Sequence, residues 1–400
     1  MTDAPASVVP SPPAGPRRRR AILDLLIVVP FLALIATPLL GQLAGTGAAT
    51  SRAESRRASS RPAVAWNARA LVKLSADWTA YFDGHFAFRL DVIRWYNHLA
   101  WQWLGISPSP TVLKGRDGWL FYADDGALQD YLSERPFAPA DLEQWRQTLQ
   151  HTNDWLAARH IRYLFVVAPD KHVIYPEYMP PGIHPLQHPS RLDQLVTYLE
   201  QHTTVDIVDL RAPLLAAKAH DRVYHRTDSH WNDAGAFVAY SQIADRLLRW
   251  FPAVIPWTRD EFREEVHVTP GLDLADMLGL SDVISERRRD FVPLKRRRAR
   301  IVEPAHPDPD FEEGRLVTVV DNPDLPRAVV FRDSFMSALI PFLSEHFQRA
   351  VYLWQNDFDP DVVRQEQPTV VIQELVGRRL TTYLPYDAVA AEGDVVGSKP

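Results

Sequence analysis

Short, uninterrupted apolar runs alternate with helical patterns from residue 139 onward, and this alternation constrains the fold more than any other feature. The pattern predicts helices over 139–160, 192–202, 233–250 and 336–347, and strands over 163–167, 205–208, 328–331, 350–353 and 369–372. Strands that are apolar along their whole length are typical of parallel sheets buried on both faces. We therefore predict an α/β fold in which helices cover both sides of a mostly parallel sheet.

Two stretches depart from this pattern. Residues 251–327 interrupt it, and we predict that they form an insertion. Before the alternation begins, apolar residues recur at helical spacing over 66–103, and KGRDGWLFY (114–122) has the form of a hairpin with Asp117 and Gly118 in its turn. We expect one domain over residues 66–385 that contains the insertion, followed by a short tail over 386–400.

The N-terminal residues have the features of a membrane-targeting segment. Four arginines, Arg17 to Arg20, precede the apolar stretch AILDLLIVVPFLALIATPLLGQLAG at 21–45. This stretch exceeds the roughly 20 residues that cross a bilayer, and basic residues before it keep that end in the cytoplasm. We expect a cytoplasmic tail over 1–20, a transmembrane signal-anchor over 21–45 and a linker over 46–65. The remaining chain would then lie in the periplasm, attached to the inner membrane by a single pass. The alternative is a cleaved signal peptide and release into the periplasm.

The composition narrows the possible chemistry. The chain of 400 residues contains no cysteine, which excludes disulfides, thiolate metal sites and cysteine nucleophiles. Its formal net charge is −6, and we do not expect nucleic acid as a partner. Basic clusters at 287–289 and 295–298 are more typical of a solvated face than of a site, although contact with an anionic glycan is an alternative.

A serine stands where an apolar strand gives way to a predicted helix. In AVVFRDSFMSAL (328–339) this residue is Ser334, at the carboxyl end of a strand, where ligands of parallel sheets collect. A serine nucleophile needs a base that a third group orients. HRTDSHWNDAGA (225–236) offers Asp228 and His230, which would lie on one side of an extended chain. Backbone N–H groups after Ser334 could supply an oxyanion hole.

Other roles account for the same residues. Ser334 could cap the helix that follows it, Asp228 could cap the next predicted helix, and His230 could be a hydrogen-bonded core residue. A metal site is a further alternative, because His220, His225, Asp228 and His230 are clustered and such residues bind Zn²⁺. Their spacing matches no helical H-x-x-x-H arrangement, so we expect neither a metal nor a cofactor.

Several ordered segments resemble the alginate O-acetyltransferase AlgX/AlgJ family, whose catalytic domain is similar to SGNH hydrolases. They are WTAYFDGHFAFRLDVI (78–93), KGRDGWLFY (114–122), APDKHVIYPEYMP (168–180), TDSHW (227–231), GLDLADML (271–278) and FRDSF (331–335). The resemblance implies an SGNH hydrolase-like, flavodoxin-like fold. It also implies a triad in which Ser334 is the nucleophile, His230 the general base and Asp228 the group that orients His230. Arg332 stands where ordinary SGNH enzymes have a glycine, and Asn356 is a candidate for their oxyanion-hole asparagine.

Lys171 and Tyr175 follow the first predicted core strand, on the side of the sheet expected for the site. We assign them, together with Arg332 and Asn356, as candidate substrate-binding residues. They could orient a sugar or polarise an acyl oxygen. The alternative is a solvated lysine and a packed tyrosine.

The resemblance implies an enzyme that transfers acetyl groups to hydroxyls of an exported polysaccharide through an acetyl-serine intermediate. The polysaccharide would be the acceptor, and a multi-pass membrane acyltransferase would deliver the acetyl groups from the cytoplasm. One alternative is a polysaccharide acetyl esterase with the same triad. Another is a non-catalytic module of exopolysaccharide assembly.

Overall fold

The computed structural model describes residues 16–43, 73–79, 81, 88–186, 189–303 and 314–391. The chain divides into two units, Met1–His98 and Leu99–Pro400. The first contains α1 (Pro16–Leu43) and nearly all of α4 (Arg89–Leu99). Among the residues described, no helix combines the length and the apolar character needed to cross a membrane. The predicted linker over 46–65 and the terminal residues 1–15 and 392–400 lie outside the described ranges.

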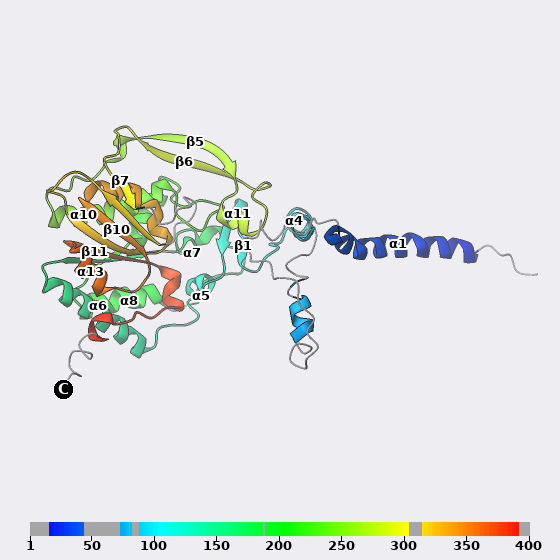
Figure 1. Cartoon of the computed structure of the whole chain (residues 1–400), viewed down its shortest axis with the longest axis horizontal. Helices are drawn as coiled ribbons and strands as arrows, with labels where there is room; N and C mark the ends of the chain where they lie inside the picture. Colours follow the sequence, from blue (N-terminus) through cyan, green and yellow to red (C-terminus); the bar gives the residue numbers. More distant parts are fainter. Residues whose placement is uncertain are drawn as a thin grey trace, which may run out of the picture. The chain divides into compact units, whose positions relative to one another are not determined.

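The second unit is built on a seven-stranded sheet with the order β4-β3-β11-β9-β10-β8-β7 (Figure 1). Five neighbouring strands are parallel: β4 (Asp206–Asp209), β3 (Arg162–Ala168), β11 (Val370–Val376), β9 (Arg327–Arg332) and β10 (Arg349–Trp354). At one edge, β8 (Arg315–Val319) pairs antiparallel with both β10 and β7 (Arg300–Glu303). The prediction of a mostly parallel sheet is confirmed, and the observed sheet is mixed.

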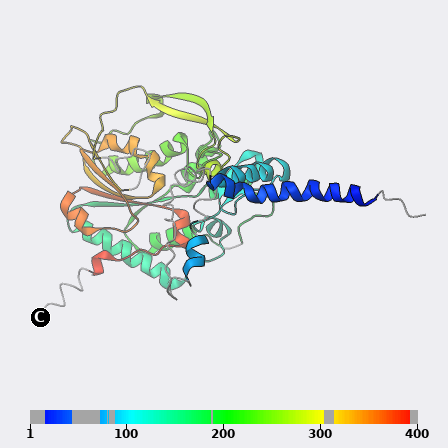
Figure 2. The ribbon, with the colours of Figure 1, turned by 45° about the vertical axis from the view of Figure 1, so that its right-hand side comes forward.

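Apolar side chains on both faces of this sheet form two hydrophobic clusters, because successive residues of a strand point to opposite faces. One cluster joins the sheet to α9 (Arg211–Lys218) and α10 (Asp233–Trp250). The other joins it to α6 (Pro139–Ala157), α8 (Arg191–His202) and α13 (Pro360–Glu366). Figure 2 shows helices on either side of the strands. The predicted two-sided cover is therefore confirmed.

Most predicted elements lie within a few residues of the observed ones, but the helix predicted over 336–347 is broken. It consists of η5 (Ser334–Ala338), α12 (Ile340–Leu343) and η6 (Ser344–His346). Proline lacks an amide hydrogen and is tolerated only in the first turn of a helix. Pro341 stands near the start of α12, so no continuous helix can run through it.

Part of the segment 251–327 joins the main sheet, and another part forms a separate two-stranded sheet. Its strands β5 (Phe262–Pro270) and β6 (Ser285–Pro293) form a separate antiparallel pair with α11 (Asp273–Met277) between them, whereas β7 and β8 extend the main sheet. The sequence pattern indicates none of these four strands. Charged residues occupy much of them, as in FREEVHVTP and SERRRDFVP, so they lack the apolar runs of the central strands.

The predicted hairpin is confirmed as β1 (Val112–Lys114) and β2 (Leu120–Tyr122), with Asp117 and Gly118 at φ of 52° and 77° in its turn. The remaining short elements are η1 (Ala100–Leu104), η2 (Arg116–Gly118), α5 (Ala127–Leu132), α7 (Lys171–Ile174), η3 (Pro176–Tyr178), η4 (Arg259–Glu261) and η7 (Gly377–Thr381).

The order of the strands includes a point where the connections between strands change direction. After β3 the chain continues to β4, and after β9 it continues to β10, in opposite directions along the sheet. Open α/β sheets bind ligands at the carboxyl ends of strands where the connections diverge in this way. β9 ends at Arg332, and Ser334 follows after one intervening residue, Asp333, at this edge.

Candidate active site

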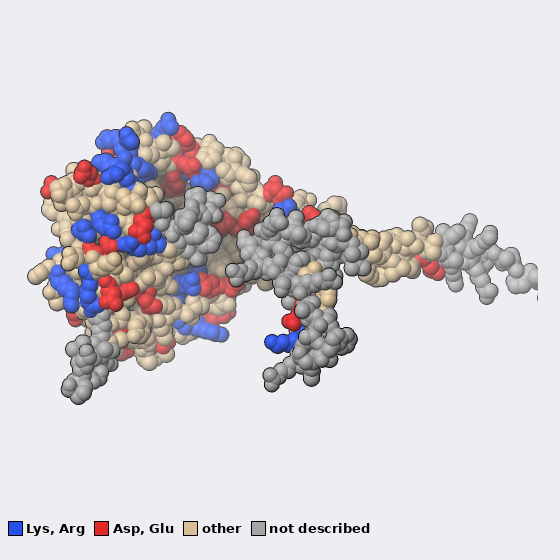
Figure 3. Space-filling model, in the orientation of Figure 1, with Lys and Arg blue, Asp and Glu red and all other residues tan. Residues whose placement is uncertain are grey.

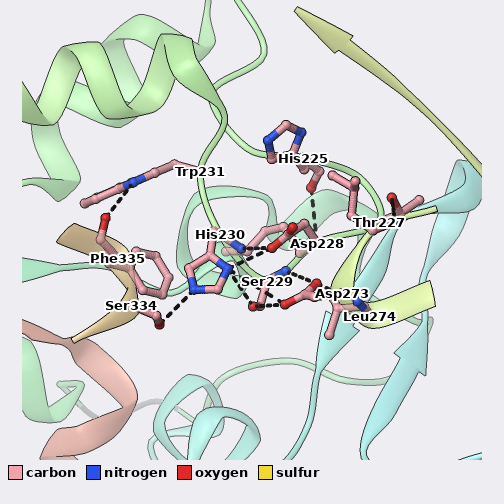
Figure 4. Close-up of polar contacts among 12 residues, drawn as sticks. His225, Thr227, Asp228, Ser229, His230, Trp231, Asp273, Leu274, Ser334 and Phe335 are labelled. Atoms are coloured by element: carbon pink, nitrogen blue, oxygen red, sulfur yellow. Dashed lines mark hydrogen bonds and ion pairs between the residues drawn. The ribbon is translucent and has the colours of Figure 1, made fainter. Parts of the chain in front are cut away.

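Ser334, His230 and Asp228 form a continuous chain of hydrogen bonds (Figure 4). The Oγ of Ser334 lies 2.8 Å from Nε2 of His230. Nδ1 of the same imidazole lies 2.8 Å from Oδ1 of Asp228. The side chain of His230 is 27% exposed, and Ser334 is also partly exposed. A small molecule can therefore approach a hydroxyl whose proton has an acceptor within transfer distance.

A tight bend, rather than the extended chain that we predicted, brings Asp228 and His230 together. The bend is stabilised by Oδ1 of Asp228, which also accepts a hydrogen bond from the backbone N–H of His230 at 2.9 Å. Tyr224 and Trp231 form a β-bridge that closes the loop behind them. The indole Nε1 of Trp231 then donates to the backbone oxygen of Phe335 at 3.1 Å, which ties the histidine loop to the serine turn.

The electrostatics favour His230 as a base. Burial opposes the charged imidazolium, but the hydrogen bond and the charge of Asp228, followed by the charge of Asp273, outweigh it and raise the pKa of His230. Burial likewise opposes the ionised form of Asp228, but its bonds to His230 hold the pKa of this carboxyl well below its usual range. Asp228 is therefore a carboxylate at neutral pH.

Asp333, not Ser334, caps η5. Its Oδ1 accepts from the backbone N–H of Phe335 at 2.9 Å, and its Oδ2 accepts from that of Val376 at 2.7 Å. The hydroxyl of Ser334 is therefore directed to His230 instead of to a helix end. The same bond engages the N–H of Phe335, so that group is not available for the oxyanion hole that we expected after Ser334.

A second buried acid supports the serine turn. Oε2 of Glu374, on β11, accepts from the backbone N–H of Asp333 at 3.1 Å. Burial, followed by the charge of Asp333, raises the pKa of Glu374 well above its usual range. Burial and the adjacent carboxyl of Asp333 therefore both favour the protonated form of Glu374.

The capping and core alternatives for the other two triad residues also fail. The cap of α10 is Asn232, whose Oδ1 accepts from the N–H of Gly235 at 3.1 Å, so Asp228 has no capping role there. The side chain of His230 is 27% exposed, so it is not a fully buried core histidine. His225 is the buried histidine of this loop, and burial lowers its pKa to about 4.

Lys171 lies inside the histidine loop and is neither solvated nor open to substrate. The residue is 1% exposed, and its Nζ donates to the backbone oxygens of His225, Arg226 and Asp228 at 3.2, 3.3 and 2.5 Å. Burial lowers its pKa to about 8, although the carboxylates of Asp273 and Asp228 favour its charge. We conclude that Lys171 fixes the loop that carries Asp228 and His230.

We expect Lys171→Met to lower the free energy of unfolding by about 3 kcal/mol, because three buried carbonyls lose a donor. Unfolded chains hold the lysine proton up to the usual pKa of 10.5, whereas the folded chain releases it near 8. The wild type should therefore gain stability relative to the variant as the pH rises between these values. Urea denaturation at several pH values measures both effects. Lys218→Met, which removes a partly exposed lysine bonded to Glu177, is the matched control. Equal stabilities of wild type and Lys171→Met would contradict the role of Lys171.

The other candidate substrate-binding residues have structural contacts. The phenol oxygen of Tyr175 accepts from the N–H of Val223 at 2.9 Å, and its ring is buried. Arg332 is buried, and its Nη1 donates to Oγ of Ser337 at 2.9 Å. The backbone oxygen of Asn356 accepts from Gln373, and no contact places its side chain at the triad among the described residues. The structure therefore does not bring Tyr175, Arg332 and Asn356 together around Ser334.

The segment 251–327 holds the histidine loop from outside. Oε2 of buried Glu286, on β6, accepts from the N–H groups of Arg226 and Thr227 and from Oγ1 of Thr227, each at 2.9 Å. Just before α11, the N–H of Leu272 donates to Oγ1 of Thr227 at 3.1 Å. This segment is therefore part of the site's support.

The cluster of possible metal ligands differs from the predicted one. Among the described residues, Asp228, His230 and Asp273 have ligand atoms within 4.8 Å of one another, whereas His220 and His225 are not in this group. Both nitrogens of His230 already bond Ser334 and Asp228. A cation bound there would have to displace one of these bonds.

Basic and acidic side chains are interspersed on the face in view in Figure 3, and the two basic clusters form ion pairs with acidic residues. Arg289 pairs with Asp221 and Glu264, and Arg288 with Asp290. In the second cluster, Lys295 pairs with Glu261 and Arg298 with Glu345. These ion pairs fit a solvated, internally neutralised surface.

Asp273 is the residue of the site that the sequence reasoning missed. It lies 43 positions after His230, yet its Oδ2 is 3.8 Å from the imidazole Nδ1. Its only signal is its place in GLDLADML, one of the segments that carry the family resemblance.

Comparison with known proteins agrees with this fold. The family described as "SGNH hydrolase-like domain, acetyltransferase AlgX" matches residues 112–357. "Probable alginate O-acetylase AlgJ" of Pseudomonas putida is 31% identical over 145 residues, and that of Pseudomonas syringae pv. tomato is 26% identical over 214. These alignments cover 35% and 52% of this chain, and 34% and 50% of those relatives.

A solved structure supports the same conclusion for the fold alone. The structure of Bacillus cereus PatB1 superposes with a TM-score of 0.51 at 16% identity, covering 67% of this chain and 96% of that chain. The family match spans more than half of the 400 residues and includes Asp228, His230, Asp273 and Ser334. The chain therefore belongs to the family of the SGNH hydrolase-like domain of acetyltransferase AlgX.

Proposed function

We propose that this protein transfers acetyl groups to hydroxyls of an exported polysaccharide through an acetyl-serine intermediate on Ser334. One observation carries the proposal: the Ser334 hydroxyl lies 2.8 Å from an imidazole whose other nitrogen bonds a carboxylate. This is the arrangement by which a serine hydroxyl becomes a nucleophile. The names of the relatives, which refer to O-acetylation of alginate, support the choice of reaction.

In the first half-reaction, Oγ of Ser334 attacks the acetyl carbonyl while Nε2 of His230 accepts the hydroxyl proton. The tetrahedral intermediate then expels the donor's leaving group, which takes the proton from His230. Asp228 stabilises the imidazolium throughout and remains ionised, because its pKa is held well below its usual range by the bonds to His230.

In the second half-reaction, a sugar hydroxyl attacks the acetyl-serine. His230 accepts the proton of that hydroxyl and returns it to Oγ of Ser334 as the sugar ester forms. The enzyme is restored, and the net change is transfer of one acetyl group from the donor to the sugar hydroxyl, with the hydroxyl proton passing to the donor's leaving group. The covalent intermediate predicts ping-pong kinetics.

Trapping the intermediate tests this proposal. We expect brief incubation with p-nitrophenyl acetate to add one acetyl group to the protein, located at Ser334 by peptide mass spectrometry. Adding an oligosaccharide should then remove the label and yield acetylated sugar. Acetylation elsewhere, with Ser334 unmodified, would refute the assignment. If the added sugar does not change the rate at which free acetate is released, and no acetylated sugar forms with any polymer offered, the protein is the esterase that is our alternative.

We also propose that the domain acts in the periplasm, held at the inner membrane by the N-terminal segment. The arginines at 17–20 followed by the apolar stretch at 21–45 support this location. A multi-pass membrane acyltransferase would supply acetyl groups to an enzyme held there. Protease treatment of spheroplasts should digest the domain without lysis. A domain that is protected until lysis would contradict export.

A further inference from the structure

A second carboxylate lies beside the histidine of the triad. Oδ2 of Asp273 is 3.8 Å from Nδ1 of His230, and Oγ of Ser229 lies between them, 2.5 Å from Asp273 and 3.2 Å from Nδ1 (Figure 4). The N–H of Ser229 donates to Oδ1 of the same carboxylate at 2.8 Å. Both oxygens of Asp273 are thus fixed by the residue between the two triad members.

The bonds between Ser229 and Asp273 are not needed to hold the histidine loop against α11. Asp273 begins α11, and the loop is already held to this region by the bonds of Thr227 to Leu272 and Leu274. The additional bonds of Ser229 direct a partly exposed carboxylate toward the imidazole, although Asp228 already bonds it. A carboxylate near an imidazolium stabilises that ion even without a hydrogen bond.

We propose that Asp273 is a second acid of the site: positioned by Ser229, its carboxylate shares with Asp228 the stabilisation of the imidazolium that forms when His230 takes the proton of Ser334. Asp273 acts through His230 and is a positioning residue. The inference rests on the proposed function, because it concerns the same proton transfer.

The charged groups around the imidazole determine whether loss of the Asp273 charge raises or lowers the pKa of His230. Asp228 belongs to its own loop, Asp273 to α11, and Arg378 to η7. Lys171 of α7 faces the two carboxylates from below the loop. The two acids favour the charged imidazole and Arg378 disfavours it. Burial, followed by the charge of Asp228, raises the pKa of Asp273 itself to about 6.

Asp273→Asn tests the proposal through a pH profile. Loss of the negative charge should lower the pKa of His230, so the base form persists to lower pH. We expect the acid limb of kcat/KM for p-nitrophenyl acetate to move down by about half a pH unit. Turnover at the optimum should fall by about three- to tenfold. Asp276→Asn, an equal charge change at an exposed position of α11, is the control and should leave the profile unchanged.

A profile of Asp273→Asn that superposes on the wild type, or that moves to higher pH, would overturn the proposal. If this variant fails to fold, Ser229→Ala gives the answer, because it frees Asp273 while keeping its charge. A smaller shift to lower pH supports the proposal, and an unchanged limb rejects it. Failure of the proposed function is a separate result: turnover would not depend on Ser334 in any of these proteins.

Discussion

Ser334→Ala should lower kcat for an activated acetyl ester by about 10⁴-fold or more, with little change in stability. The hydroxyl oxygen of Ser334 is the atom that bonds to the acetyl carbon, and alanine lacks it. His230→Ala should be about as damaging, and the double variant no worse than either, because the residues act as a unit. Steady-state hydrolysis of p-nitrophenyl acetate and acetylation of the exported polymer in cells measure the loss.

Ser337→Ala is the matched control for this experiment. Ser337 lies three residues later in the same short helix, and its Oγ accepts a hydrogen bond from Arg332 at 2.9 Å. The same atom is deleted in both variants, but only Ser334 faces the imidazole. If Ser334→Ala retains wild-type turnover, catalysis by this serine is wrong, and the non-catalytic alternative becomes the better account.

The central strands could be predicted because their apolar runs are intrinsic to the sequence. Phe165 and Val329 belong to strands buried on both faces, and such strands need no knowledge of their neighbours to be recognised. The strands β7 and β8 of the main sheet and the separate pair β5 and β6 could not be predicted in this way. They are half exposed or rich in charges, so their pairing depends on partners distant in the chain.

Local spacing predicted the pairing of Asp228 with His230, and the family resemblance implied the triad with Ser334, 104 positions later, whereas the supports of the triad were not predicted. Asp228 and His230 are two residues apart, so almost any turn brings them into reach. The burial of Lys171 depends on three carbonyl groups that lie more than 50 positions later. Asp273 likewise meets His230 only after α11 packs on the loop. Contacts of this kind arise from tertiary structure and leave no periodic signal.

Two substitutions of Asp228 should separate its role in orienting the imidazole of His230 from the effect of its negative charge. A single oxygen, Oδ1, accepts both from Nδ1 of His230 and from the backbone N–H of His230. The one carbonyl oxygen of Asn can accept both bonds, so Asp228→Asn keeps the imidazole in place and loses only the charge. Asp228→Ala loses both. We expect kcat to fall by about 10⁴-fold in Asp228→Ala, and by less in Asp228→Asn.

The pH dependence of turnover in these variants measures independently how Asp228 affects the pKa of His230. Because the bond and the charge of Asp228 raise the pKa of His230, the acid limb of Asp228→Asn should move to lower pH, further than that of Asp273→Asn. Kinetics of p-nitrophenyl acetate hydrolysis over the acid pH range provide both kcat and the pH at which the acid limb falls. Equal losses in the Asn and Ala variants would mean that charge, and not the bonds through one oxygen, is what His230 requires. A limb that moves upward in Asp228→Asn would show that Asp228 does not stabilise the imidazolium at all.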